Sequence, residues 1–186
     1  DRCLSRGLGD VYKRQDKPQY SHAKKDYLKD ELWQDNFRHL TNRKLSFDIQ
    51  IYPHQFDDAC KLAKRYPNVQ FILNHTGEPC FQTEEYKKYW MRKMQSLAEH
   101  ENFVCKISGL GMFNPSWTII STEYFILKTI EIFGIDRCMF GSNFPVDKIF
   151  NTFDNYWNSY FEIVKNFSKD EHNKIFFKNA EKFYKI

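Results

Sequence analysis

Polar residues stand at the ends of apolar runs in this 186-residue chain, where they could do chemistry together. His75 directly follows one apolar run and precedes Gly77, whose backbone freedom allows a sharp turn. An imidazole at the end of a strand can bind a metal, act as a general acid or base, or polarise a carbonyl oxygen. The alternative is a histidine that only caps the loop through hydrogen bonds.

Lys106 and Ser108 lie on the same face of their predicted strand, because they are two residues apart. A lysine enclosed by other strands would be desolvated, and could serve as a base or bind an anion. The alternative is that Lys106 reaches the solvent from the end of the strand. Ser108 could donate a hydrogen bond to a substrate, or merely satisfy the turn at Gly109.

Asn143 carries an amide in a glycine-flanked turn, at a place where a carboxylate would be a natural base for activating water. An asparagine cannot take up a proton at pH 7, but it can orient a water molecule or a substrate carbonyl. Asparagine is also common in tight turns for structural reasons alone. Asp147 is the nearest carboxylate and could replace it, although we expect Asp147 to lie in the loop.

The apolar run at residues 45–51 contributes Gln50, and the loop after it contributes Tyr52. In a barrel the apolar side of this strand would face the helices, so Asp48 and Gln50 would face inward. Tyr52 and His54 flank a proline, and from this loop both could contact a substrate. A histidine in the position of His54 is more often simply exposed.

No spacing typical of a metal site occurs in the sequence. His-x-His, His-x-x-x-His and Cys-x-x-Cys are all missing, and the six histidines are scattered along the chain. The cofactor therefore stays unknown: a divalent metal such as zinc is conceivable, with His75 as one ligand, but the ligands in this chain do not support it. Phosphate-binding loops, nucleophile elbows and dinucleotide fingerprints are missing too.

Four predicted strands start near residues 45, 69, 103 and 137. The segments with helical periodicity are residues 30–42, 56–66, 83–97, 121–133, 155–167, 168–176 and 179–184. Repeated strand–helix units imply parallel strands with crossover helices, so that the polar residues at the strand ends gather at one edge. The spacing suits a (β/α)₈ barrel, which needs ~250 residues. The fold class is therefore α/β, either a small open sheet or half of a larger barrel.

The composition indicates a packed protein, with 18% aromatic residues. The formal net charge is +4, and the basic residues are mixed with acidic ones, which gives little reason to expect a nucleic-acid partner. No apolar run approaches the ~20 residues that span a bilayer, and no signal peptide opens the chain. Five cysteines without a Cys-x-x-Cys pair fit a reducing compartment. We therefore expect a cytoplasmic protein without a membrane partner.

Residues 1–15 lack both helical and strand periodicity. They carry four basic and two acidic side chains, which is half of the net charge of +4. We interpret them as a non-native leader, and assign residues 16–186 to one domain.

Three strings of the sequence resemble the amidohydrolase-related (amidohydrolase 2) family. They are Phe71-Ile72-Leu73-Asn74-His75-Thr76-Gly77, Lys106-Ile107-Ser108-Gly109-Leu110-Gly111 and Arg137-Cys138-Met139-Phe140-Gly141-Ser142-Asn143-Phe144-Pro145-Val146-Asp147. The family includes lactonases acting on sugar lactones and on 2-pyrone-4,6-dicarboxylate, together with metal-dependent decarboxylases. The resemblance covers about residues 30–186 and is strongest to the predicted metal-dependent hydrolases of the TIM-barrel fold.

The resemblance implies that the chain holds the last four strand–helix units of a distorted (β/α)₈ TIM barrel. A His-x-His pair closes the first strand in the family, and that strand would precede this chain. His75 would correspond to the mid-barrel histidine that contacts the substrate carbonyl or a metal. The closing strand of the family usually reads Gly-Ser-Asp-x-Pro, with the Asp activating water. Asn143 stands at that position here, which puts the usual activation of water in doubt.

We therefore predict a hydrolase that opens a lactone or a similar cyclic ester of a small-molecule substrate by attack of water. The catalytic candidates are His75 and Asn143, and the substrate-binding candidates are Gln50, Tyr52, Lys106 and Ser108. One alternative is a metal-dependent, non-oxidative decarboxylase of the same superfamily. Another is an inactive fragment or a binding module. Assembly into a homo-oligomer stays open.

Overall fold

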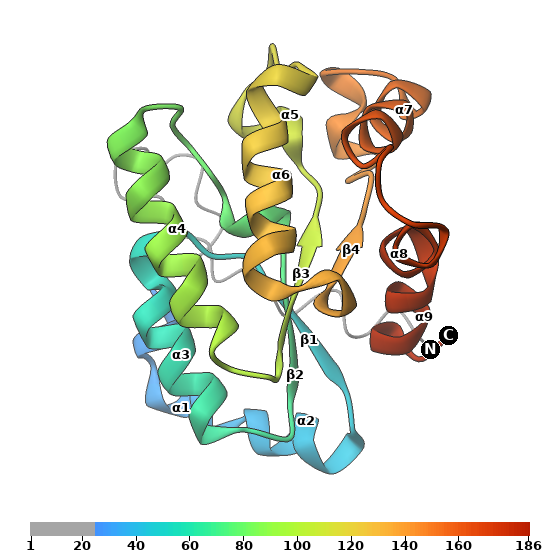
Figure 1. Cartoon of the computed structure of the whole chain (residues 1–186). Helices are drawn as coiled ribbons and strands as arrows, with labels where there is room; N and C mark the ends of the chain where they lie inside the picture. The colour runs from blue at the N-terminus through green and yellow to red at the C-terminus, as the bar shows by residue number, and fades with distance from the viewer. Residues whose placement is uncertain (1–24) are drawn as a thin grey trace.

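A computed structural model describes residues 25–186 and shows one parallel sheet flanked by helices (Figure 1). The strands lie in the order β1-β2-β3-β4, and each neighbouring pair is parallel. Their bounds are Ser46–Ile49, Gln70–Leu73, Phe103–Ile107 and Cys138–Phe140. The four predicted strands and the α/β class are thus confirmed. The predicted leader, residues 1–15, lies outside the described residues.

Long helices join successive strands. They are α3 (Phe56–Arg65) between β1 and β2, α4 (Glu84–Ala98) between β2 and β3, and α6 (Ile119–Phe133) between β3 and β4. Figure 1 shows α3, α4 and α6 side by side over one face of the sheet, while α7 (Phe153–Ile163) lies beyond β4. Within the described part of the chain, no helix has the length and apolarity needed to cross a membrane.

Short elements complete the described chain. They are η3 (Tyr27–Lys29), α1 (Glu31–Asp35), α2 (Phe37–Arg43), η4 (Pro53–Gln55), η5 (His75–Gly77), α5 (Leu110–Phe113), η6 (Ile135–Arg137), η7 (Val146–Ile149), α8 (Lys169–Asn173), the π-helical η8 (Lys174–Lys178) and α9 (Asn179–Tyr184).

The prediction of one helix over residues 30–42 is wrong, because the helix is divided at Asn36 into α1 and α2. Asp30 accepts a hydrogen bond from the Trp33 N–H at 2.8 Å and so caps the short α1. The division turns Leu32 to the solvent, with 76% of its surface exposed. It leaves Trp33 and Phe37 packed edge to face, with ring centroids 4.7 Å apart.

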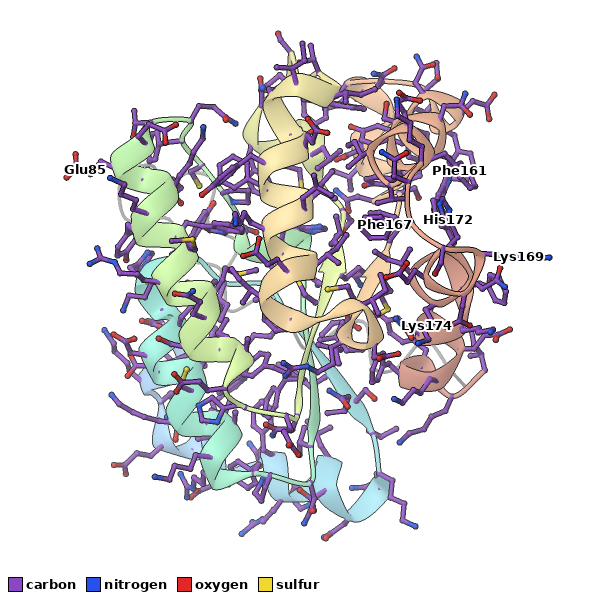
Figure 2. All side chains as sticks on the ribbon, viewed as in Figure 1. Glu85, Phe161, Phe167, Lys169, His172 and Lys174 are labelled. Carbon is purple, nitrogen blue, oxygen red and sulfur yellow. The ribbon has the colours of Figure 1, made fainter. Side chains whose placement is uncertain are left out.

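Two predicted helix starts are confirmed by their caps. The Thr83 side chain accepts a hydrogen bond from the Tyr86 N–H at the start of α4. Ser168 and Glu171 form a capping box at the start of α8, where the predicted helix begins. Beside this capping box, the ring centroid of Phe176 lies 4.2 Å from that of Phe161 in α7 and 5.7 Å from that of His172 in α8. Figure 2 shows Phe161 and His172 close together, so this aromatic stack joins α7 to the C-terminal helices.

The sheet separates two apolar clusters, because successive side chains of a strand point to opposite faces. The larger cluster lies on the side of α3, α4 and α6, and includes Phe71 and Phe103 with ring centroids 5.2 Å apart. The smaller one packs Phe183 of α9 against the other face, on Ile72, Val104 and Met139. Asp48 pairs with Ile72 and Lys106 with Met139 in the sheet register, so both charged residues share this second face, as predicted for Asp48.

Asn179 ties α9 to the sheet from a buried position. Its side chain is 4% exposed, and Nδ2 donates to the carbonyl oxygens of Ile135 and Cys138, both at 2.7 Å. Because these carbonyl groups lie away from water, removing the donor leaves them poorly satisfied. The placement of α9 therefore depends on this amide.

We predict that Asn179→Ala lowers the free energy of unfolding by about 2 kcal/mol, because it leaves two buried acceptors without their donor. Urea denaturation monitored by circular dichroism measures this loss. The matched control is Asn166→Ala, at an exposed position, which should stay within about 0.5 kcal/mol of the parent. Equal stability of the two variants would contradict the role given to Asn179.

Candidate functional site

A cleft of about 450 Å³ lies at the carboxyl ends of the four strands. This volume is in the range that encloses a small molecule. The lining residues come from all four strand ends and from the C-terminal helix: Asp48, Gln50, Asn74, His75, Lys106, Ser108, Gly141, Ser142, Asn143, Phe144 and Tyr184. The structure thus brings together five of the six predicted site residues, namely Gln50, His75, Lys106, Ser108 and Asn143.

Tyr52 is the predicted site residue that the structure keeps out of this lining. It is 4% exposed, its N–H donates to Gln55 Oε1 at 3.2 Å, and its ring stacks on His54 at 6.0 Å. The turn η4 begins directly after it at Pro53. This local packing buries Tyr52, so its expected contact with substrate from the loop is not part of the observed cleft.

A left-handed turn after β2 brings His75 into the cleft. His75, Thr76, Gly77 and Glu78 have φ values of 53°, 57°, 63° and 57° in succession. Only glycine adopts this region freely, and a β-branched threonine is uncommon there, so the turn stores strain. Trp90 of α4 donates from Nε1 to the Thr76 carbonyl oxygen at 3.0 Å and holds the turn in place.

Two glycines make room for this turn, as predicted for Gly77. A Cβ on Gly77 would lie 2.7 Å from Phe56 Cζ and 2.9 Å from Met94 Sδ. A Cβ on Gly109 would lie 2.7 Å from His75 Nδ1, and Gly109 also has a φ of 67°. Any other residue at either position would therefore clash with the packing or with the imidazole.

His75 is a buried, neutral imidazole. Its Nδ1 lies 2.8 Å from Ser108 Oγ, and the residue is 6% exposed. Burial, reinforced by the positive charge of Lys106, lowers the pKa of His75 to about 3. When the Ser108 hydroxyl donates to Nδ1, the ring proton is on Nε2, which can then donate a hydrogen bond. Ser108 thus orients His75, and the two lie together in the cleft wall.

Lys106 forms hydrogen bonds with two side chains of the cleft, and its ammonium group does not extend into the solvent. Its Nζ donates to Asp48 Oδ1 at 2.7 Å and to the Tyr184 hydroxyl at 2.8 Å. Tyr184 in turn donates to the same Asp48 oxygen at 2.8 Å. The lysine ammonium has three donors, so these two partners leave one for another acceptor. The three side chains form a cluster in which the charges of Lys106 and Asp48 compensate each other.

Six residues of the cleft lining are not among the predicted site residues: Asp48, Asn74, Gly141, Ser142, Phe144 and Tyr184. A signal existed for the first, since Asp48 and Lys106 are the charged residues of two strands that both alternate with apolar residues. Tyr184 gave no local signal, because it lies 136 residues from Asp48. Asn74 precedes His75, and its Oδ1 is buried with no hydrogen-bond partner among the described residues.

Asn143 faces the cleft with Asp147 behind it. Asn143 has a φ of 56°, and its Nδ2 donates to Asp147 Oδ1 at 2.8 Å. Asp147 lies in the connection between β4 and α7, as expected, but the turn η7 within this connection buries it fully. Burial raises the pKa of Asp147, although hydrogen bonds from Asn143, Tyr156 and the Gly111 N–H act against this. Asp147 is therefore not available to the cleft as a direct base.

The described residues do not make a metal site. No three His, Cys, Asp or Glu side chains in residues 25–186 are grouped closely enough to hold a metal ion. His75 could supply one nitrogen ligand, but the nearest carboxylate of the cleft lining, Asp48, is occupied by Lys106. A lysine ammonium beside the imidazole also repels a cation. The donor set of the described residues therefore does not fit a zinc ion.

We predict that the free energy of unfolding falls more steeply with decreasing pH in the parent protein than in the variant His75→Gln. The folded-state pKa of His75, about 3, is below its ordinary value of 6.5, so between these values only the unfolded chain binds this proton. Each pH unit in that window costs up to about 1.4 kcal/mol. Urea denaturation at pH 7 and pH 5 measures the difference. An equal loss of unfolding free energy between pH 7 and pH 5 in the parent and in His75→Gln would contradict a buried neutral imidazole. The control variant is His39→Gln, at an exposed histidine.

The sequence of this chain is similar to parts of longer known proteins. An uncharacterized protein of Sinorhizobium fredii, y4mH, is 42% identical over 154 residues, which are 83% of this chain and 52% of that protein. The L-fucono-1,5-lactonase of Burkholderia ambifaria is 26% identical over 169 residues, covering 88% of this chain and 58% of the lactonase. The chain thus spans about half the length of the curated relatives it matches.

A solved structure shows the same fold. The crystal structure of an amidohydrolase from Burkholderia multivorans with bound HEPES matches with a TM-score of 0.81 at 20% identity, over 86% of this chain and 60% of that one. This match confirms that the four strand–helix units are part of a TIM-barrel fold, as predicted. The model of the amidohydrolase family matches residues 19–186. With its strand ends meeting in one polar cleft, this chain belongs to the amidohydrolase family.

Proposed function

We propose that the protein is a hydrolase that opens the cyclic ester of a sugar lactone. The observation that carries this proposal is the neutral imidazole of His75, oriented by Ser108, in the same cleft as the Asn143 amide. The similarity to an L-fucono-1,5-lactonase supports the substrate class, although it is distant at 26% identity. The proposal concerns the whole protein, because this chain spans about half the length of such relatives.

The charge of the cleft favours a neutral, hydroxylated substrate. Its lining is mostly amide, hydroxyl and backbone groups, and its two charged side chains, Lys106 and Asp48, compensate each other. A sugar lactone carries hydroxyl groups that such residues can bind by hydrogen bonds. A pyrone dicarboxylate carries two negative charges, which call for unpaired cations. Among the described residues of the cleft, Lys106 is the one cation, and it already has a carboxylate partner.

His75 and Asn143 have complementary roles in this proposal. His75 Nε2–H donates to the lactone carbonyl oxygen, and stabilises the negative charge that develops there as water attacks. A neutral imidazole suits this role, because it keeps a proton to donate without carrying a charge. Asn143 orients the water or a substrate hydroxyl. The water oxygen bonds to the carbonyl carbon and the ring C–O bond breaks. One water proton ends on the released hydroxyl group, and the other is released to solvent when the new carboxylic acid ionises.

One observation favours a second candidate, a module that binds such ligands without turning them over. The carboxylate that lines the described cleft and the one behind Asn143 are both engaged: Asp48 with Lys106 and Tyr184, and Asp147 with Asn143. Neither is free to take the proton of an attacking water.

We predict that the protein expressed from its full reading frame hydrolyses a neutral sugar lactone, such as L-fucono-1,5-lactone, and leaves 2-pyrone-4,6-dicarboxylate unchanged. His75→Ala should lower kcat/KM at least about 100-fold, because it removes the donor to the developing oxyanion. A pH-indicator assay over a panel of lactones, corrected for spontaneous hydrolysis and repeated with a chelator, measures this.

The control variant is Asn166→Ala, at an exposed residue, which should keep the parent activity. If calorimetry shows that lactones bind and the assay shows no turnover, the hydrolase proposal is contradicted and the binding module is supported. No turnover and no binding of any lactone in the panel would contradict both.

A further inference from the structure

Asp147 is a buried carboxylate with a complete set of donors around it. It is fully buried, and receives the Asn143 Nδ2–H at 2.8 Å on Oδ1 and the Gly111 N–H at 3.4 Å on Oδ2. The hydroxyl of Tyr156 donates to it as well. Tyr156 itself accepts a hydrogen bond from Trp117 Nε1 at 3.1 Å. The three partners of the carboxylate come from α5, from the turn after β4 and from α7, so Asp147 joins three parts of the chain.

This arrangement decides which atom of the Asn143 amide meets the cleft. A carboxylate only accepts hydrogen bonds, so the amide must turn its NH₂ group toward Asp147. The same NH₂ group has a second contact, from Nδ2 to Met112 Sδ at 3.1 Å. The Oδ1 atom accepts no hydrogen bond from a described residue, and Asn143 lines the cleft. The cleft is therefore offered an acceptor at this position.

We propose that Asp147 is a positioning residue that locks the Asn143 amide, so that Oδ1 accepts a hydrogen bond from a substrate hydroxyl or from the attacking water. The orientation itself stands on the geometry alone, whereas its use in catalysis rests on the proposed lactonase function. A fixed acceptor at this place selects a ligand group that donates, and disfavours a carboxylate. Asn143 thus contributes to the choice of a hydroxylated substrate.

The same pair explains why an amide can replace the Asp that closes the related sequence pattern Gly-Ser-Asp-x-Pro. A carboxylate at position 143 would stand about 2.8 Å from Asp147, and two carboxylates at such a distance cannot both be ionised. One amide and one carboxylate, in contrast, satisfy each other. The geometry points to positions 143 and 147 as a unit that holds one negative charge.

Exchange of the two residues tests this unit. In Asp147→Asn the new amide must use its oxygen for the Gly111 N–H, so its NH₂ group meets Asn143 and turns that amide over. In Asn143→Asp/Asp147→Asn the hydrogen bond is restored in the opposite direction, from the new amide at position 147 to a carboxylate that now lines the cleft. The single variant Asn143→Asp places two carboxylates together. Asp154→Asn, at an exposed Asp, is the matched control for loss of charge.

The direct readout is the hydrogen exchange of the Asn143 side-chain NH₂ group, measured by NMR on protein labelled with ¹⁵N-asparagine and assigned through Asn143→Ala. In the parent these protons should exchange at least about 10-fold more slowly than those of exposed asparagines, and Asp147→Asn should remove this protection. Asp154→Asn should leave it unchanged. Equal exchange in the parent and in Asp147→Asn would overturn the proposal.

Two further readouts separate positioning from simple folding. Asn143→Asp should lower the midpoint of thermal unfolding by about 5 °C or more at pH 7, and the exchanged double variant should regain most of it. Where lactone turnover is present, kcat/KM should fall at least about 10-fold in Asp147→Asn. Absence of turnover in every form, parent included, would reject the lactonase function, while the exchange measurement would still decide the orientation of Asn143. A double variant that is no more stable than Asn143→Asp would contradict the inference that positions 143 and 147 together hold one negative charge.

Discussion

The left-handed turn after β2 is the constraint on which the site depends. Four successive residues from His75 to Glu78 have positive φ, and a free chain would avoid such a conformation. Packing maintains it, since Gly77 has no room for a side chain between Phe56 and Met94, and α4 binds the turn through Trp90. The turn ends β2 abruptly and places the imidazole against Ser108, directly after the next strand. The strain is thus concentrated where the chemistry is proposed.

The cleft combines low charge with fixed orientation. Three of its polar side chains are each held by another residue: His75 by Ser108, Lys106 by Asp48 and Tyr184, and Asn143 by Asp147. Such supporting contacts reduce the reorganisation needed when a ligand binds. They also remove net charge from the cleft, because Lys106 and Asp48 are paired with each other. A neutral ligand with several hydroxyl groups matches this arrangement better than an anion does.

The strands, their parallel order and the meeting of their polar ends could be predicted from the sequence, because period-two runs separated by helical segments leave few topologies open. Five of the six predicted site residues line the observed cleft, because they stand at or just after the ends of strands. Side chains fixed by distant packing could not be predicted. Tyr184 joins Asp48 across 136 residues, Asp147 is buried by elements far along the chain, and Tyr52 is turned away by the short helix that begins at Pro53.

Membership in the amidohydrolase family explains the barrel-like arrangement, whereas Asn143, which is held by the buried Asp147, departs from the sequence pattern that this part of the chain resembles. The account as a whole requires a ligand to lie between His75 and Asn143. A crystal structure of the protein with the hydroxy acid product or an unreactive lactam analogue of a sugar lactone tests this most directly. The expected result is a ligand in which the carbonyl or carboxyl oxygen lies within hydrogen-bond distance of His75 Nε2 and a hydroxyl group donates to Asn143 Oδ1. A ligand bound outside this cleft, or one that touches neither residue, would contradict it.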